Sequence, residues 1–195
     1  MNSKNIRLLV IVGIVAILGF WGCNSFNGLV RNDEGVKKAW GDVQAQYQRR
    51  ADLIPGLIKT VQEAAKNERA ILENVTKARA GIVDAKNQIA NATTPAQLEA
   101  ANRTVNSALT IAVEAYPQVR STEAFLKFQD DLTGTENRIT QARTDYNTAV
   151  QRFNISVRSF PGNIIAGMAG FKSKEEFSSK PGAENAPDYD KIWNK

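Results

Sequence analysis

A long apolar run lies near the N-terminus. Residues 8–21 read LLVIVGIVAILGFW, and no charged residue occurs between Leu8 and Arg31. With the mildly polar residues that follow, about 20 residues are available, and at about 1.5 Å per residue they can cross a hydrocarbon layer of about 30 Å. The run therefore predicts a transmembrane anchor over residues 1–27. Its apolar side chains include Leu8, Ile11, Val15, Leu18, Phe20 and Trp21.

Two alternatives to a permanent anchor remain open. A cleaved secretory signal normally ends in a small-residue site, and none follows this run. Gly22-Cys23 could instead end a lipoprotein signal, although Phe20 and Trp21 are poor residues for the two positions before it. Lys4 and Arg7 precede the run and favour a cytoplasmic N-terminus, which would place the remainder on the extracytoplasmic side of the cell (inner) membrane. Arg31, Lys37 and Lys38 lie close on the other side and oppose this orientation, partly offset by Asp33 and Glu34.

The next segment has helical spacing. Val36, Trp40, Val43 and Tyr47 are separated by four, three and four residues, so they share one helical face. This predicts that the anchor continues into the first bundle helix. Near Pro55 the pattern restarts, and either a helix boundary at residues 50–55 or a kink in one continuous helix explains the proline.

A heptad pattern then runs from Ile54 to Ile89. Every seventh position is valine or isoleucine except Glu68, and the row three residues later is mostly alanine. The pattern predicts a long helix that packs closely against its neighbours and ends near residues 91–95. Thr94 and Gln97 flank Pro95 as a capping box, which predicts the start of another helix.

Two proline motifs limit the remaining helices. Pro117 ends the helix that starts near Pro95, and a clear heptad from Phe125 to Phe153 predicts a further long helix, which ends at residues 160–162. Residues 164–171 predict a short helix that packs on the bundle end or touches a lipid headgroup layer. The polar segment from Ser178 predicts a loose tail. The whole pattern is that of an all-α protein, with an anchor (1–27), a bundle (28–177) and a tail (178–195).

Composition removes several classes of function. The net charge is +5, but Lys4 and Arg7 precede the apolar run, and the rest has no basic stripe of the kind that binds nucleic acid. The chain has one cysteine and no histidine, so metal and triad chemistry lack their usual side chains. No phosphate-binding loop or nucleophile motif is present. The sequence therefore predicts a non-enzymatic protein without a metal or cofactor.

Several polar residues are candidates for structural or interaction roles. Glu68 in a core row either pairs with a basic residue inside the bundle, which Arg49 or Arg50 could supply, or faces a crevice. Together with Glu114, Glu123 and Glu136, Glu68 resembles the carboxylate set of a di-iron bundle, but such sites also need histidine.

Aromatic and amide residues form a second group of candidates. Tyr116-Pro117 and Phe160-Pro161 are interpreted as helix ends at which the rings cap the core and the prolines enforce the turn. Asn137 and Asn147 are interpreted as polar residues that are hydrogen-bonded within the bundle.

Several motifs occur in an order that resembles the LemA family. They cover residues 26–177 and, besides Asn27-Gly28-Leu29-Val30, include Arg49-Arg50-Ala51-Asp52-Leu53-Ile54-Pro55, Glu114-Ala115-Tyr116-Pro117, Thr135-Glu136-Asn137, Tyr146-Asn147 and Phe160-Pro161-Gly162-Asn163. The resemblance implies a single-pass membrane protein with an elongated antiparallel bundle of three to four long helices. Its relatives are mostly without an assigned activity, and some are associated with membrane-compartment formation in bacteria.

The anchor and the long heptads lead to one functional expectation and one alternative. We expect a membrane-bound scaffold that contacts the lipid bilayer and self-associates as a homo-oligomer, with a role in membrane organisation or remodelling. The alanine-rich row and a helix that continues from the anchor into the bundle are expected to let neighbouring copies pack side by side. The alternative is a monomeric adaptor that recruits an envelope protein.

Overall fold

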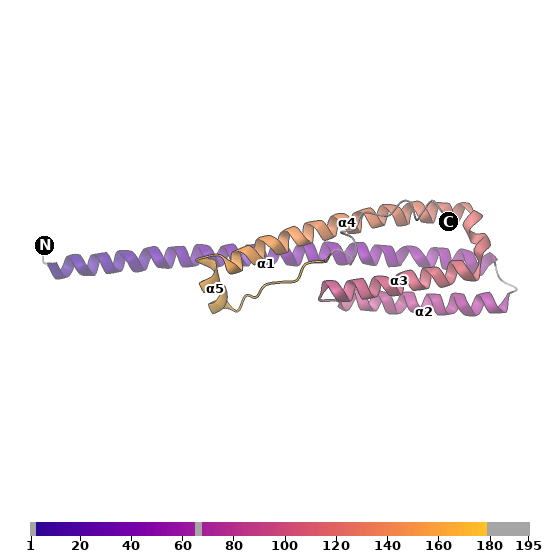
Figure 1. The fold of residues 1–195 in the computed structure, drawn as a ribbon, viewed down its shortest axis with the longest axis horizontal. Coiled ribbons are helices and arrows are strands. Elements are labelled where there is room, and N and C mark those ends of the chain that lie inside the picture. Colours follow the sequence, from indigo (N-terminus) through magenta and orange to yellow (C-terminus); the bar gives the residue numbers. More distant parts are fainter. Residues whose placement is uncertain (1–2, 65–67, 179–195) are drawn as a thin grey trace, which may run out of the picture.

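The computed structural model describes residues 3–64 and 68–178, and all its regular elements are helices (Figure 1). They are α1 (Ser3–Ala64), α2 (Arg69–Asn91), α3 (Pro95–Ala115), the 3-10 helix η1 (Pro117–Ser121), α4 (Glu123–Arg158) and α5 (Gly162–Ala169). The predicted all-α class is confirmed. The predicted tail lies outside the described residues, apart from Ser178.

Helix α1 is continuous over 62 residues and contains Pro55 in its interior. No helix boundary therefore occurs at residues 50–55. A proline inside a helix costs about 3 kcal/mol because one backbone hydrogen bond is lost. Here the pyrrolidine ring is exposed, whereas Ile54, Leu57 and Ile58 beside it are at most 3% exposed. Burial of these side chains on both sides of the proline offsets that cost and keeps the helix intact.

The chain reverses direction between α1 and α2, at a point that the heptad pattern did not predict. Helix α1 ends at Ala64 and α2 begins at Arg69, so the long helix predicted from Ile54 to Ile89 is wrong. Val61 and Val75 lie on either side of the reversal and are both 0% exposed. Because both helices turn an apolar row to the same core, the spacing of seven continues in the sequence although the helix does not.

The predicted ends of α3 and α4 are confirmed. Thr94 caps α3: its hydroxyl accepts from the backbone N–H of Gln97 at 3.3 Å, and the Gln97 side chain accepts from the N–H of Thr94 at 3.2 Å. Pro117 begins η1 directly after α3. The predicted rows of α4 are largely buried, and they include Phe125, Phe128, Thr135, Ile139, Ala142, Tyr146 and Phe153.

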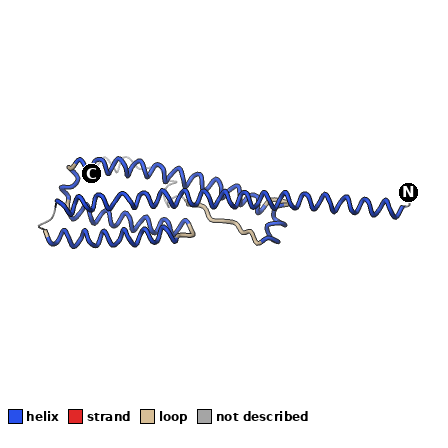
Figure 2. The backbone as a smooth tube through the Cα atoms, turned by 180° about the vertical axis from the view of Figure 1, so that it is seen from behind, coloured by secondary structure: helices blue, strands red, loops and turns tan. Residues whose placement is uncertain are grey.

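The helices form an elongated molecule in which α1 and α4 lie side by side (Figures 1 and 2). The hairpin of α2 and α3 covers only the half of the α1–α4 pair that is far from the N-terminus. On the nearer half its place is taken by α5 and by the extended residues 171–178, which we call the strap. The α1–α4 pair is thus covered by two different kinds of structure along its length.

The alanine row of α2 is used inside the bundle. Ala78 and Ala85 are 0% exposed and Ala92 is 4% exposed, so small side chains allow α2 to approach its neighbours closely. Gly81 belongs to the same close packing, because a Cβ atom there would lie 3.5 Å from that of Ala108 on α3.

The N-terminal part of α1 extends beyond the rest of the protein (Figure 1). It is long and apolar enough to cross a membrane, and its apolar window is 0% buried within the chain. Ile11, Val15, Phe20 and Trp21 are each at least 60% exposed, while the side chains of Leu8 and Leu18 lie outside the description. Within residues 3–64 and 68–178 there is therefore one candidate membrane helix, and it lies at the N-terminus.

Candidate interaction site

Two asparagines of α4 hold the backbone of the strap. The side chain of Asn147 donates to the carbonyl oxygen of Phe177 at 2.9 Å and accepts from the Phe177 N–H at 2.8 Å. Asn154 makes the same pair of bonds with Lys174, at 2.9 and 2.8 Å. The two asparagines are seven residues apart and so share one face of α4. Each carboxamide uses both its donor and its acceptor, as a neighbouring β-strand would, and thus binds main chain without regard to side-chain identity.

An aromatic cluster fixes the far end of the strap. The Phe177 ring stacks on Trp40 with centroids 6.2 Å apart and meets the edge of Tyr146 at 5.4 Å. The guanidinium of Arg143 lies 4.9 Å from the Phe177 ring centroid. Phe177 is only 6% exposed, so this side chain is part of the core rather than of a loose tail. Its burial contributes about 2 kcal/mol to holding the strap in place.

Asp33 joins the strap to α1 by an ion pair. Its carboxylate lies 2.8 Å from the ammonium of Lys174 and 2.9 Å from that of Lys37. Burial opposes ionisation, but the hydrogen bonds from the two lysines outweigh it, so the pKa of Asp33 is lowered from its ordinary value. Hydrogen bonds to the carboxylates of Glu34 and Asp33 raise the pKa of Lys37. Asp33 is therefore charged at neutral pH and stabilises the attached strap.

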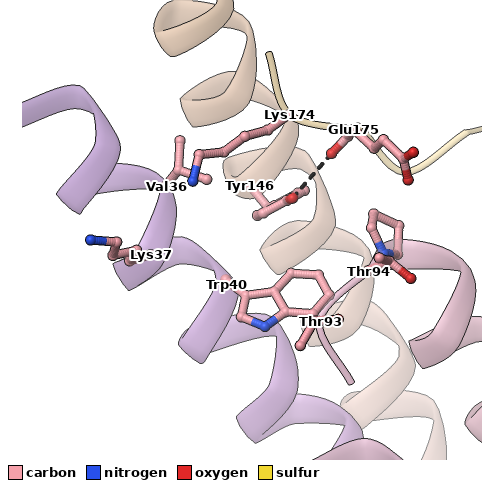
Figure 3. A pocket seen from close by; sticks show the side chains of 9 residues that line it. Val36, Lys37, Trp40, Thr93, Thr94, Tyr146, Lys174 and Glu175 are labelled. Carbon is pink, nitrogen blue, oxygen red and sulfur yellow. Dashed lines mark hydrogen bonds between the residues drawn. The ribbon is translucent and has the colours of Figure 1, made fainter. Parts of the chain in front are cut away.

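A pocket of about 310 Å³ opens where the strap meets the turn between α2 and α3 (Figure 3). Trp40 and Tyr146 line it on one side and Thr93, Thr94 and Pro95 on the other. The Tyr146 hydroxyl donates to the carbonyl oxygen of Glu175 at 3.0 Å. Burial, with Glu175 and Glu176 nearby, raises the pKa of Tyr146, so the phenol stays protonated and remains a donor. The pocket is thus apolar at its base, with charged groups at its rim.

The rim charges come from Lys37, Lys174 and Glu175, whose side chains surround the pocket in Figure 3. Lys174 is already paired with Asp33, whereas the Glu175 side chain is exposed. The rim thus carries charges of both signs beside a mainly apolar lining.

Two arginines connect the helices further along the bundle. Arg50 is 9% exposed and pairs with Glu136 of α4 and, at 2.8 Å, with the side-chain oxygen of Asn106 on α3. Arg143 donates to the Tyr47 hydroxyl and lies 3.2 Å from Glu99. Both arginines tie α1, α3 and α4 together and so fix the register of the helices.

The prediction that Glu68 is a buried partner of Arg49 or Arg50 is wrong. Glu68 occupies the N-cap position of α2 without a capping hydrogen bond from its side chain, and it is exposed because the chain reverses before it. Arg50 pairs with Glu136 instead. Arg49 is exposed. Asp52, one residue of the same sequence motif, pairs with Lys86 of α2 at 2.6 Å.

The aromatic predictions have mixed outcomes. Tyr116 is half-buried against the core between α3 and η1, as expected, and is followed by Pro117. Phe160 is 76% exposed, so the prediction that its ring caps the core is wrong. Helix α5 starts at Gly162, so the chain turns directly after Phe160 and leaves its ring exposed.

The remaining candidates are placed as follows. Glu114 and Asn137 are exposed on α3 and α4. Asn147 is hydrogen-bonded as predicted, although to the strap rather than to another helix. Asn154 was missed, and its signal was its spacing of seven from Asn147 beside Phe153 of the heptad. Across residues 3–64 and 68–178 no group of three or more acidic, cysteine or histidine side chains is arranged to hold a metal ion.

Comparisons with known proteins agree with these motifs. The model of the LemA family matches residues 39–190. Magnetosome protein MamQ 2 of Paramagnetospirillum magneticum is 36% identical over 72 residues, which is 37% of this chain and 26% of that protein. Protein LemA of Metamycoplasma hominis is 22% identical over 164 residues, which is 84% of this chain and 74% of that protein.

Magnetosome protein MamQ of Magnetospirillum gryphiswaldense is 31% identical over the same length of 72 residues. The chain thus spans about a quarter of the length of the magnetosome relatives. The family match, in contrast, extends over most of the bundle and the strap. On this match the chain belongs to the LemA family.

Proposed function

We propose that the protein is a membrane-anchored, non-enzymatic helical scaffold that self-associates beside the membrane. The observation that carries the proposal is the unbroken course of α1 from Ser3 to Ala64. At about 1.5 Å per residue this helix is roughly 90 Å long, and its apolar N-terminal part lies outside the bundle. A membrane helix of this kind holds the bundle at a defined angle to the bilayer instead of tethering it loosely.

Self-association is proposed through the anchor rather than through the alanine row. Ala78, Ala85 and Ala92 are buried within the bundle and leave no surface for a neighbour. Gly13 and Gly19 of α1, in contrast, have no atom within 4 Å of a Cβ position. Membrane helices associate through small residues that let backbones approach. Gly13 and Gly19 lie on different faces of α1, about 120° apart at 3.6 residues per turn, and each can admit a neighbouring anchor.

The test of self-association is the mass of the protein in its membrane environment. We would extract the full chain in mild detergent, or with native lipid in polymer discs, and measure mass photometry over a range of concentrations. Oligomers that disappear in the Gly13→Ile, Gly19→Ile variant support the proposal. Gly41→Ile is the matched control, because Gly41 is also open but lies within the bundle part of α1. Monomers at every concentration would overturn it.

We further propose that the bundle lies on the extracytoplasmic side of the cell membrane. The support is the pair of cations, Lys4 and Arg7, that precede the apolar run. A reporter that is active in only one compartment, fused after Lys195, tests this placement. Activity of a periplasmic reporter supports it, and activity of a cytoplasmic reporter overturns it.

The alternative function is that of an adaptor that recruits another envelope protein. Two observations favour the adaptor. The side chains of Asn147 and Asn154 bind main-chain groups, and the pocket beside Trp40 is partly open. Crosslinking in cells separates the two functions: a ladder of self-adducts supports the scaffold, and one dominant heterologous adduct supports the adaptor.

A further inference from the structure

Helix α5 lies beside the end of the candidate membrane helix and runs across the long axis of the molecule (Figure 1). Its residues Ile165, Met168 and Ala169 line a pocket of about 430 Å³ with Gly22, Cys23 and Phe26 of α1. The Ile165 side chain reaches to 4.0 Å from a Cβ position at Gly22. An element far along the sequence is therefore packed against the last turns of the apolar segment.

The crosswise direction of α5 is built into the chain. Gly162 lies so close to the backbone of Ser156 that a Cβ atom there would collide with the carbonyl oxygen. At the other end Gly170 adopts a positive φ of 78°, and the N–H of Phe171 donates to the carbonyl of Ala166 at 2.9 Å. Two glycines thus permit the sharp turns that set α5 across α1 and return the chain to the strap.

The outer face of this corner is apolar. Met168 is 83% exposed, Phe160 is 76% exposed and Ile164 is 53% exposed, and Phe26 of α1 is 42% exposed next to them. These side chains gather at one end of the bundle. In a protein with a candidate membrane helix, such a group of exposed apolar side chains favours contact with lipid over contact with water.

The distance along α1 places this face at the bilayer surface. A hydrocarbon layer of about 30 Å needs about 20 helical residues, and counting from Leu8 this length ends near Asn27. The α1 residues that line the pocket, from Gly22 to Asn27, fall within the last part of that length. Beyond this level, towards the bundle, lie the exposed basic residues Arg31, Arg158 and Lys172, which suit contact with lipid phosphates.

From these observations we infer that α5 and the turn before it form an interfacial membrane element. Ile164 and Met168 of α5 and Phe160 of the turn enter the surface of the same bilayer that α1 crosses. The inference rests on the proposed anchor and adds a second contact with lipid. A second contact away from the axis of α1 would fix the rotation of the bundle about that axis, which a single membrane helix leaves free.

The test uses nitroxide spin labels on single cysteines in the full chain, in the Cys23→Ser background and in phosphatidylcholine–phosphatidylglycerol vesicles. Ile164→Cys and Met168→Cys report on α5, Val15→Cys on the anchor, and Leu126→Cys on the bundle, where the side chain is 55% exposed. Power saturation with oxygen and with a water-soluble nickel complex gives the depth of each label. All four sites are exposed within the chain, and far-UV circular dichroism checks that each variant remains helical.

We expect the labels at 164 and 168 to be more accessible to oxygen than to nickel, with a depth between that of the label at 15 and the aqueous label at 126. Nickel-accessible labels at both α5 positions would overturn the inference, while a deep label at 15 would leave the anchor standing. A nickel-accessible label at 15 would overturn the anchor, and the α5 labels would still decide whether this helix binds lipid.

Discussion

Asn147 and Phe177 are joined by two hydrogen bonds, in which one side-chain carboxamide pairs with both the N–H and the carbonyl of one backbone residue. Thirty residues separate them in sequence. These bonds help to hold the strap on the bundle. They act on the same residue whose ring packs in the cluster around Trp40.

The first prediction is that Asn147→Ala releases the strap. Loss of both bonds leaves two backbone groups of Phe177 without their partner, which costs about 1–3 kcal/mol locally. Hydrogen exchange of residues 172–178, followed by mass spectrometry in detergent micelles, should therefore be faster by about 10-fold or more. Asn137→Ala is the matched control, since Asn137 is on the same helix and exposed. Equal exchange in the two variants would contradict the role of Asn147.

The second prediction concerns acid. The pKa of Asp33 in the folded protein is below its ordinary value of 3.8, so its stabilising effect is complete above that pH and is lost as the pH falls towards the folded value. Attachment of the strap should be constant from neutral pH to about pH 4 and weaken below it.

The Asp33→Asn variant isolates this effect from the other carboxylates. Even at neutral pH this variant should weaken the attachment of the strap by about 1 kcal/mol, a small effect because Lys174 is 32% exposed. The attachment should also depend less on acid than in the native protein. Fluorescence of Trp40 in a background without the other tryptophans measures both properties. An acid profile identical to that of the native protein would show that Asp33 does not control the strap.

The third prediction compares two neighbouring arginines. Arg50 is 9% exposed and bonded to Glu136 and Asn106, whereas Arg49 is exposed. Arg50→Ala should lower the free energy of unfolding by about 2–3 kcal/mol, because packing and two polar partners are lost together. Arg49→Ala should change it by less than about 0.5 kcal/mol. Denaturant unfolding followed by circular dichroism measures both, and similar losses would refute the register role of Arg50.

Local signals in the sequence predicted both ends of α3 well. The Thr94 capping box and the proline at 117 act within one turn of the chain, so their effect does not depend on distant contacts. The heptad of α4 was equally informative, because the chain stays helical through the whole pattern and its rows are largely buried.

Features that depend on distant segments were not predictable in this way. Glu68 continues the spacing of seven, and only the reversal after Ala64 shows that the row belongs to two helices. The partner of Arg50 is 86 residues away. The strap lacks periodicity, so its capture by Asn147 and Asn154 is visible only once α4 and residues 171–178 are brought together.

The last prediction tests whether continuity of α1 carries the geometry of the bundle. Lys59 is exposed on α1 and lies about 48 Å along the helix from Asn27, at about 1.5 Å per residue. A donor dye on Lys59→Cys, in the Cys23→Ser background, and acceptor dyes on lipid headgroups should therefore give weak energy transfer with a narrow distribution of distances. A Gly-Ser spacer inserted after Asn27 should shorten the mean distance and broaden its distribution, since the bundle could then tilt towards the bilayer.

A helical insertion of seven residues keeps the helix face nearly unchanged and is the matched control: it should lengthen the distance by about 10 Å without broadening the distribution. Identical distributions for the spacer and the native chain would mean that α1 does not act as a rigid connection.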